Sequence, residues 1–248
     1  MNIGFLITAR LKSTRLPRKV LLPLNGFTVI ERVIQRAKQV VDPKKVVLCT
    51  SSKFQDKPLV EKATQNNINC FKGHPDDVIE RLTRAAKYFG YDYILSITAD
   101  NPLFSIEYAI RILDEFNKNS SLDYVYSSKL PIGLNVYGVK VNAMELVCAI
   151  KQIVDTEIWG GFFNRPEIFN VKEINVDLEH RMENCRLTLD ESADYDVINT
   201  IYERSGKNEI LNILDLYNII KKDEKVLKKN INVAQRKIDR NIQEKIDE

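Results

Sequence analysis

The feature that most constrains the fold of this chain is a regular alternation between short apolar runs and longer segments with helical periodicity. The apolar runs cover residues 3–8, 45–50, 68–71, 93–98, 124–127 and 136–141. The segments with helical periodicity cover residues 29–40, 59–66, 78–89 and 106–117. A helix between consecutive strands joins them in parallel and covers the sheet. The sequence therefore predicts an α/β fold with a mostly parallel sheet and helices on both faces.

The second half of the chain continues this pattern less regularly and then changes in composition. We expect two more helices and two more strand-like segments, at residues 143–153, 194–204, 169–176 and 186–189. Neither an internal repeat nor a Gly/Ser linker interrupts the chain, so residues 1–220 are expected to form a single domain. Residues 221–248 carry nine Lys and Arg against six Asp and Glu, which predicts a charged C-terminal helix or tail. This segment is either solvated or laid over a partner subunit or the active site.

Composition argues against several classes of protein. The net charge is only +3, and residues 221–248 account for all of it, which is too little for a general nucleic-acid binder. No run approaches the roughly 20 apolar residues that cross a bilayer, and the N-terminus lacks the pattern of a signal peptide. The four cysteines are far apart and form no C-x-x-C pair, which suggests neither a zinc site nor disulfides. We therefore expect a cytoplasmic protein that binds neither nucleic acid nor membranes.

A cluster of positive charge follows the first apolar run. Five cations lie within ten residues, with no carboxylate before Glu31: Arg10, Lys12, Arg15, Arg18 and Lys19. A loop that follows a strand and is rich in cations and hydroxyl donors suits a polyphosphate, such as that of a nucleotide triphosphate. The P-loop and G-x-G-x-x-G patterns are missing, so side chains would hold the phosphates. The alternative is a basic loop that is solvated or makes weak surface ion pairs.

Two aspartates follow apolar runs that are far apart in the sequence. Asp100 follows the run YILSIT and precedes a turn, and Asp190 ends the run RLTLD before a helix. If they meet at one edge of the sheet, the two carboxylates could hold Mg²⁺ together with substrate phosphates. The alternative for each is a helix N-cap or a turn residue. Asp77 opens a helix and could likewise be a cap or meet a nucleotide base. The two histidines are too few and too far apart for a metal site.

Four motifs occur in a fixed order between residues 3 and 203: TARLKSTRLPRK, GHPDDVIERL, ITADNPL and RLTLDESADYDVI. They resemble the motifs A-R-x-x-S-T-R-L-P-G-K, G-x-x-x-D-V-L-x-R, T-G-D-x-P-L and R-L-T-V-D-T-x-x-D-F. These motifs belong to the SpsF-type (spore coat polysaccharide) cytidylyltransferases, which are related to enzymes that make CMP-activated sugar acids. The resemblance implies a Rossmann-like nucleotidyltransferase fold. It also implies transfer of CMP from CTP to an acceptor, with release of pyrophosphate and with Mg²⁺ as cofactor.

The resemblance further implies roles for single residues. The residues that would bind the triphosphate are Arg10, Ser13, Arg15 and Lys19. Asp100 and Asp190 would hold the Mg²⁺. Asp77 and Arg81 would lie near the nucleotide. Among these, Lys19, Arg15 and Asp100 would be catalytic. Lys19 and Arg15 would stabilise the negative charge that grows on the leaving pyrophosphate.

The chain departs from the family pattern at several positions. Arg18 stands where the family usually has Gly, and Ala99 replaces the Gly before Asp100. In the segment LPIGLNVYGV, Asn135 and Tyr137 replace an Asp and a Glu. This segment would border the acceptor pocket, so two negative charges are missing there. The loss favours a small anionic acceptor, such as a sugar acid or a phosphorylated sugar or polyol, for surface polysaccharide biosynthesis.

Three other functions stay open at this point. The nucleotide could be UTP or dTTP, because base choice depends on a few backbone contacts. A metal-dependent glycosyltransferase would typically show Asp-x-Asp, whereas Asp100 is followed here by Asn101 and Pro102. A non-catalytic nucleotide-binding protein is the third alternative. The resemblance also implies that a homodimer is possible.

Overall fold

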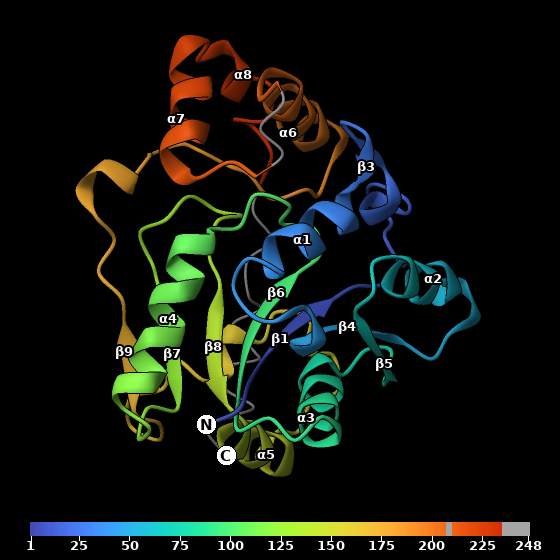
Figure 1. Cartoon of the computed structure of the whole chain (residues 1–248), viewed down its shortest axis with the longest axis vertical. Helices are drawn as coiled ribbons and strands as arrows, with labels where there is room; N and C mark the ends of the chain where they lie inside the picture. The colour runs from blue at the N-terminus through green and yellow to red at the C-terminus, as the bar shows by residue number, and fades with distance from the viewer. Residues whose placement is uncertain (207–209, 235–248) are drawn as a thin grey trace.

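One sheet organises the molecule (Figure 1). The structure is a computed structural model, and it describes residues 1–206 and 210–234. Within these residues, the strands of the large sheet lie in the order β5-β4-β1-β6-β8-β7-β9. Their bounds are Ile3–Thr8 (β1), Val46–Ser51 (β4), Asn69–Gly73 (β5), Tyr93–Thr98 (β6), Tyr124–Tyr126 (β7), Tyr137–Lys140 (β8) and Val171–Glu173 (β9). Only β8 runs against its neighbours β6 and β7. The predicted α/β fold with a mostly parallel sheet is confirmed.

Helices cover both faces of this sheet. Their bounds are Val29–Ala37 (α1), Lys57–Gln65 (α2), Val78–Tyr88 (α3), Ile106–Lys118 (α4), Val141–Ile150 (α5), Ser192–Arg204 (α6), Ile213–Lys222 (α7) and Lys225–Lys228 (α8). Phe5 and Ile7 of β1 share a core with α1, α2, α4, α6 and α7, whereas Leu6 shares the opposite core with α3 and α5. Successive side chains of a strand point to opposite faces, which explains this division. Each fully buried Leu, Ile or Phe contributes about 1.5–3 kcal/mol.

The centre of the sheet determines where the basic loop and Asp100 lie. All six residues of β1 are buried, as is typical of a parallel strand covered on both faces. Strand β1 pairs in parallel with β6, with Thr8 opposite Thr98. The loop that begins after Thr8 and the turn that contains Asp100 therefore leave the sheet side by side. This is the carboxyl edge, where open α/β sheets bind ligands.

Three local features differ from the sequence-based expectations. Residues 186–189 do not form a regular strand and make only one isolated bridge, between Arg186 and Ile132. Their neighbour is the irregular segment before β8, which offers no strand edge to pair with. Helix α7 was not predicted. A short hairpin of β2 (Pro23–Leu24) and β3 (Phe27–Thr28) was also missed, although Asn25-Gly26 with φ of 47° and 84° is the usual signal for such a turn.

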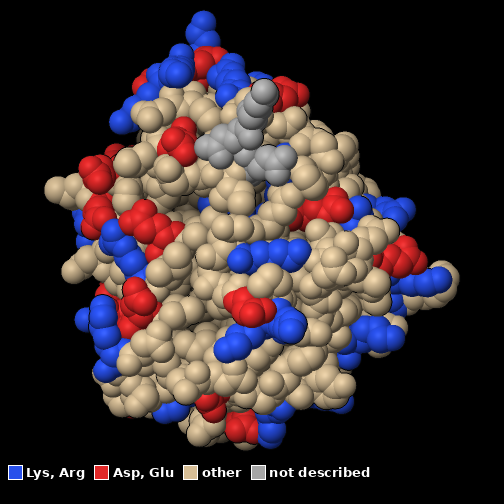
Figure 2. Space-filling model, viewed as in Figure 1, with Lys and Arg blue, Asp and Glu red and all other residues tan. Residues whose placement is uncertain are grey.

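The C-terminal segment is described as far as residue 234, and the rest of the charged segment 221–248 lies outside the described residues. Figure 1 shows α6, α7 and α8 gathered at one end of the molecule. Lys and Arg side chains cluster on the surface of that end (Figure 2). Val226 of α8 and Asn230 are nevertheless only 2% exposed, so part of this segment packs against the α/β core. None of the helices in the described ranges is long and apolar enough to cross a membrane.

Candidate active site

A cleft of about 840 Å³ lies at the carboxyl edge of the parallel strands. The loop after β1, the end of β6, the segment that leads into β8, and the irregular segment 155–164 form its walls. Four of the five loop cations line the cleft: Arg10, Lys12, Arg15 and Lys19. Arg18 is exposed and lies outside this lining. The cleft is therefore large enough for a nucleotide and is bordered by cations on one side.

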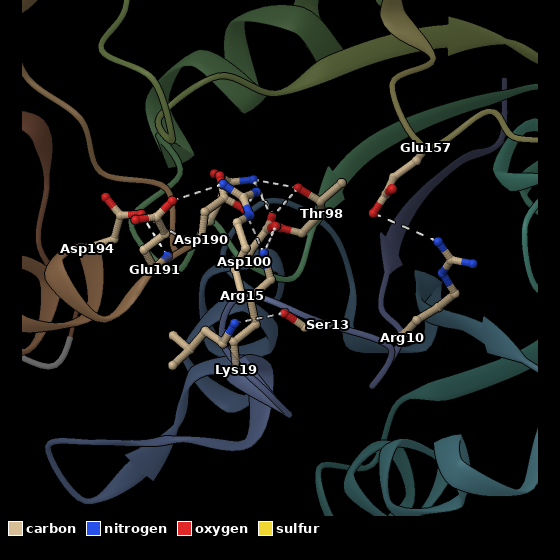
Figure 3. Close-up of polar contacts among 12 residues, drawn as sticks. Arg10, Ser13, Arg15, Lys19, Thr98, Asp100, Glu157, Asp190, Glu191 and Asp194 are labelled. Carbon is tan, nitrogen blue, oxygen red and sulfur yellow. Dashed lines mark hydrogen bonds and ion pairs between the residues drawn. The ribbon is translucent and has the colours of Figure 1, made fainter. Parts of the chain in front are cut away.

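Lys19 lies between the two aspartates that the sequence analysis singled out (Figure 3). Its Nζ atom is 2.7 Å from Oδ2 of Asp100 and 2.9 Å from Oδ1 of Asp190. Burial on its own would lower the pKa of Lys19, but the two carboxylates outweigh burial and raise this pKa above its ordinary value. Lys19 is therefore protonated throughout the neutral range.

Asp100 is oriented by its own turn. Its Oδ1 atom accepts hydrogen bonds from Oγ1 of Thr98 at 2.5 Å and from Nδ2 of Asn101 at 3.1 Å. Its other oxygen faces Lys19. Thr98 and Asn101 thus fix the carboxylate. Neither residue was predicted to have this role, although a threonine and an asparagine that flank a strand-end aspartate are a usable signal.

Asp190 is held by three cations. Its Oδ1 atom lies 3.1 Å from Arg15 as well as 2.9 Å from Lys19, and its Oδ2 atom accepts a hydrogen bond from Arg186 at 2.7 Å. Burial would raise the pKa of Asp190, but Lys19 above all, with Arg15 and Arg186, lowers it below its usual value. The Asp190 carboxylate is therefore ionised at neutral pH.

The backbone brings the two aspartates together. The amide of Leu189 donates a hydrogen bond of 2.8 Å to the carbonyl oxygen of Asp100. Gly133 makes room for this segment: its φ is +101°, and a Cβ atom there would lie 2.3 Å from the carbonyl carbon of Leu187. No other residue fits such a close approach in this conformation. The carboxylates that are far apart in the sequence therefore meet at one point.

The other cationic part of the loop lies apart from this cluster, as Figure 3 shows. Arg10 donates hydrogen bonds to the carbonyl oxygen of Pro75 and, at 2.7 Å, to Oδ1 of Asp76. A second nitrogen of Arg10 lies 3.8 Å from Glu157. Ser13 borders the cleft, and its hydroxyl accepts a hydrogen bond of 3.4 Å from the amide of Leu16, within the loop itself. The loop cations that line the cleft thus form two separate groups (Figure 3).

Asp77 and Arg81 have different positions relative to the cleft. Asp77 caps α3, accepting a hydrogen bond of 3.0 Å from the amide of Glu80, and it also forms an ion pair with Lys151. It is buried and does not border the cleft. Arg81 does border the cleft, and it donates a hydrogen bond of 2.5 Å to the carbonyl oxygen of His74. Burial lowers the pKa of Arg81.

Comparison with known proteins identifies the family. The family model described as cytidylyltransferase matches residues 5–242, which is nearly the whole chain. The chain belongs to the cytidylyltransferase family. It is therefore a CTP-dependent nucleotidyltransferase, and the family resemblance stated from the motifs is confirmed.

Individual relatives agree with this membership. The spore coat polysaccharide biosynthesis protein SpsF of Bacillus subtilis (strain 168) is 26% identical over 230 residues, which cover 90% of this chain and 95% of SpsF. The 3-deoxy-manno-octulosonate cytidylyltransferase of a Nitratiruptor species is 28% identical over 180 residues, covering 70% of this chain and 71% of that protein. Both relatives therefore match this chain over more than two thirds of its length.

Solved structures show the same fold. A cytidylyltransferase from Leptospira borgpetersenii superposes with a TM-score of 0.85 at 24% identity, covering 96% of this chain and all of the other. Rv0371c from Mycobacterium tuberculosis H37Rv, in a complex with manganese, has a TM-score of 0.56 at 16% identity and covers 79% of this chain and 96% of its own. The Rossmann-like nucleotidyltransferase fold of this cytidylyltransferase is thereby confirmed.

The wall of the cleft that includes Asn135, Tyr137 and Trp159 combines aromatic and polar side chains. Oδ1 of Asn135 accepts a hydrogen bond of 3.1 Å from the hydroxyl of Ser127. The ring of Tyr137 meets that of Trp159 edge-on at 5.4 Å, and burial raises the pKa of Tyr137. Asn135 and Tyr137 stand where the family pattern has acids, and both therefore border the cleft as neutral groups. Asp155 and Glu157 also line the cleft, so this side retains some negative charge.

A second group of possible metal ligands lies outside this cleft. Donor atoms of Glu107, Asp177 and His180 come within 4.8 Å of one another. The guanidinium of Arg111 lies 2.6 Å from Glu107 and 2.5 Å from Asp177, and it lowers the pKa of Asp177. Arg111 thus already supplies the positive charge that these two carboxylates need. We assign the group to the ion pairing of α4 with the segment around residue 178.

Proposed function

We propose that this cytidylyltransferase transfers CMP from CTP to a small anionic acceptor, either a sugar acid or a phosphorylated sugar or polyol. An acceptor oxygen attacks the α-phosphorus of CTP and forms the new P–O bond. The bond from that phosphorus to the oxygen bridging to the β-phosphate breaks on the opposite side, and pyrophosphate leaves with its electron pair. Such a reaction depends on alignment and on cations near the leaving group.

The observation that carries this proposal is the contact of Lys19 with both Asp100 and Asp190. Its Nζ atom lies within hydrogen-bond distance of both carboxylates, at 2.7 and 2.9 Å. Three of the four sequence motifs contribute to this contact, and it borders a cleft at the carboxyl edge of the sheet. A nucleotide-handling role explains why cations and carboxylates are gathered there better than a structural ion pair on the surface would.

The cations have separate roles in this proposal. Lys19 and Arg15 stabilise the charge that develops on the leaving pyrophosphate, since both lie next to Asp190. Arg10, which lies apart from this cluster, meets the remaining phosphates or the anionic group of the acceptor. Ser13 contributes a hydroxyl from the same loop, and Arg81 borders the cleft near α3. A phosphate acceptor arrives ionised, whereas a hydroxyl acceptor has to lose its proton to a base.

The residues present fit a divalent cation. One oxygen of Asp100 and one of Asp190 already converge on a single positive atom, Nζ of Lys19. Oxygen ligands of this kind are those that Mg²⁺ prefers, with substrate phosphates and water completing its shell. We propose that Asp100 and Asp190 hold Mg²⁺ when the nucleotide is bound, and that the ion neutralises phosphate oxygens. The manganese complex of Rv0371c supports a divalent cation in this fold.

The relatives and the cleft both support an anionic acceptor. The Nitratiruptor relative is named for a sugar acid, 3-deoxy-manno-octulosonate. SpsF is named for spore coat polysaccharide biosynthesis, which supports a role of the product in making a surface polysaccharide. Within this chain, the neutral Asn135 and Tyr137 favour an anion at the acceptor side, where acids would repel it.

A pyrophosphate-release assay tests the proposal. The protein is incubated with Mg²⁺ and CTP, UTP, dTTP, ATP or GTP, across sugar acids and phosphorylated sugars and polyols. We expect release that depends on CTP and on one class of anionic acceptor. Release with UTP or dTTP alone would contradict the assignment of CTP, and an uncharged acceptor would contradict the anionic class. If no combination releases pyrophosphate and CTP does not stabilise the protein against thermal unfolding, nucleotide transfer is contradicted. The remaining alternatives would then be a glycosyltransferase or a non-catalytic protein.

A further inference from the structure

A buried network supports Asp190 from behind. Arg186 reaches Oδ2 of Asp190 at 2.7 Å with one nitrogen and Oδ1 of Asp194 at 3.0 Å with another. Arg186 is 7% exposed and Asp194 is completely buried. The guanidinium therefore holds one carboxylate that faces the cleft and one that does not.

Asp194 in turn holds the backbone on which Asp190 stands. Its Oδ2 atom accepts hydrogen bonds of 3.0 Å from the amides of Asp190 and of Glu191. These are amides of the turn that leads into α6. The side chain of Asp190 is thus fixed through Arg186, and its main chain is fixed through Asp194.

Asn230 closes this network from the C-terminal segment. Its Nδ2 atom donates hydrogen bonds of 2.9 Å to Oδ1 of Asp194 and of 3.0 Å to the carbonyl oxygen of Arg186. Asn230 is 2% exposed, although it lies 36 residues beyond Asp194 in the sequence. It contacts both supports of Asp190 and borders no part of the cleft.

We propose that Asn230 is a positioning residue that sets the orientation of the Asp190 carboxylate, and with it the affinity of the site for a divalent cation. A carboxylate that binds a metal depends on hydrogen-bond partners behind it, and loss of one such partner typically weakens metal affinity or activity about 10–100-fold. The proposal rests on the function proposed above, because it takes Asp190 as a ligand of the cation. According to this proposal, the segment after α7 contributes to the site, although no motif in that segment indicates such a role.

Direct binding of Mn²⁺ tests the proposal without turnover. The free Mn²⁺ is followed by electron paramagnetic resonance as it is titrated into full-length protein with CTP kept below the protein concentration, and the same CTP without protein is titrated in parallel to account for the Mn²⁺ that the nucleotide binds by itself. We expect Asn230→Ala to weaken Mn²⁺ binding by about tenfold, the lower end of the range for a direct partner, because Asn230 acts through Arg186 and Asp194. The affinity for CTP measured without a divalent cation should stay unchanged. Asn232→Ala is the matched control, because Asn232 is the same residue type two positions away and is exposed. We expect this control to bind Mn²⁺ as the wild type does.

The outcomes separate this inference from the proposed function. If the wild type and Asn230→Ala bind Mn²⁺ equally, Asn230 is only structural and the inference is wrong, while the proposed function stands. If the wild type binds no Mn²⁺ with CTP, both are wrong. If circular dichroism shows that Asn230→Ala does not fold, Asn230→Ser is used in its place. The serine hydroxyl can restore one of the two hydrogen bonds, so an intermediate loss of Mn²⁺ affinity is expected, and wild-type affinity would overturn the inference.

Discussion

The ammonium nitrogen of Lys19 lies 2.7 Å from Oδ2 of Asp100, and the two residues are 81 positions apart in the sequence. The contact joins the end of β6 to the basic loop that follows β1. It exists because β1 and β6 are neighbours in register, so that both chains leave the sheet at the same edge. The pair therefore links the cation-rich loop at the cleft to the aspartate at the end of β6.

Removal of Lys19 or of the charge on Asp100 should stop the reaction. We expect Lys19→Ala and Asp100→Asn each to lower the rate of CTP-dependent pyrophosphate release by about 10²–10³ or more, because a preorganised charge at the reacting phosphates is lost. Both variants should remain folded. Steady-state kinetics and circular dichroism on the same samples provide the measurement.

A lysine on the surface provides the control for that pair. Lys118→Ala removes a side chain that is 71% exposed at the end of α4 and lies 3.7 Å from Glu115. It should leave the rate unchanged. Near-normal turnover by Lys19→Ala would show that Lys19 is not part of the catalytic site.

The pH dependence of stability should change when Lys19 is made neutral. In the wild type the pKa of Asp190 is lowered, so its contribution to the free energy of unfolding is present above its unfolded pKa and is lost as pH falls through the folded value. The pKa of Lys19 is raised, so its contribution is present below its unfolded pKa and is lost as pH rises through the folded value. The wild-type pair is thus intact throughout the neutral range.

Lys19→Met leaves two partly buried carboxylates without their shared cation. We expect a loss of about 1–3 kcal/mol at pH 7, less than for a fully buried pair. Without Lys19 the burial that raises the pKa of Asp190 is opposed less, so protonation of Asp190 should recover part of this loss near pH 5, where the wild type gains nothing. Mg²⁺ should stabilise the variant more than the wild type, because the ion replaces the ammonium. Urea unfolding at pH 5 and 7, with and without Mg²⁺, measures these effects, and a pH-independent difference would contradict them.

Arg18 has a backbone conformation that favours glycine. Its φ is 53° and its ψ is 29°, in the left-handed region, at the position where the family motif usually has Gly. A left-handed conformation costs a residue with a Cβ atom about 1–2 kcal/mol. Glycine avoids this cost, but it also raises the entropy of the unfolded chain, which offsets part of the gain in stability. Arg18→Gly should therefore unfold with a free energy about 1 kcal/mol higher than Arg18→Ala.

The comparison of these two variants isolates the backbone, because both remove the same charge. Thermal or urea unfolding gives the two free energies. Since Arg18 does not line the cleft, neither change should alter the KM for CTP by more than about twofold. If Arg18→Ala proved at least as stable as Arg18→Gly, the left-handed conformation would carry no cost here.

The charge of the acceptor can be tested at Asn135. Asn135→Asp restores the acid of the family pattern at nearly constant size, and Ser127 can still donate its hydrogen bond. An anionic acceptor would then meet a repulsion of about 1 kcal/mol or more, which corresponds to at least about a fivefold rise in its KM. The KM for CTP should change little. Asn232→Asp, on the surface, is the charge control, and an unchanged or lower acceptor KM in Asn135→Asp would contradict an anionic acceptor.

The alternation of strands and helices was enough to predict the fold, because parallel strands covered on both faces leave continuous apolar runs. The segment 186–189 shows the limit of that signal. Its residues are buried, but their partner is the irregular chain at Ile132, and pairing with irregular chain leaves no period in a sequence. Helix α7 is a different case, because its sequence does carry a helical signal: the buried Ile213, Leu216, Tyr217 and Ile220 have the spacing i, i+3, i+4 and i+7.

The sequence was enough to predict which charged residues form the candidate site, but not which of them contact one another. Sequence position placed Asp100 and Asp190 after apolar runs, and the structure brings them together at Lys19. The contact itself depends on strand order, which the sequence does not state. Asp77 shows the opposite case: the same residue type, also near the carboxyl edge, caps a helix and pairs with Lys151. Asn230 carried no signal, because a single asparagine in a charged segment has no distinguishing pattern.

The fate of labelled phosphates tests the central claim most directly. The protein is incubated with Mg²⁺, an anionic acceptor that supports turnover, and CTP labelled with ³²P at either the α or the γ position. We predict that the α label enters the acceptor product and that the γ label leaves in pyrophosphate, with both transfers lost in Asp190→Asn. Release of the γ label as inorganic phosphate, or an acceptor product without the α label, would contradict transfer of CMP at this site.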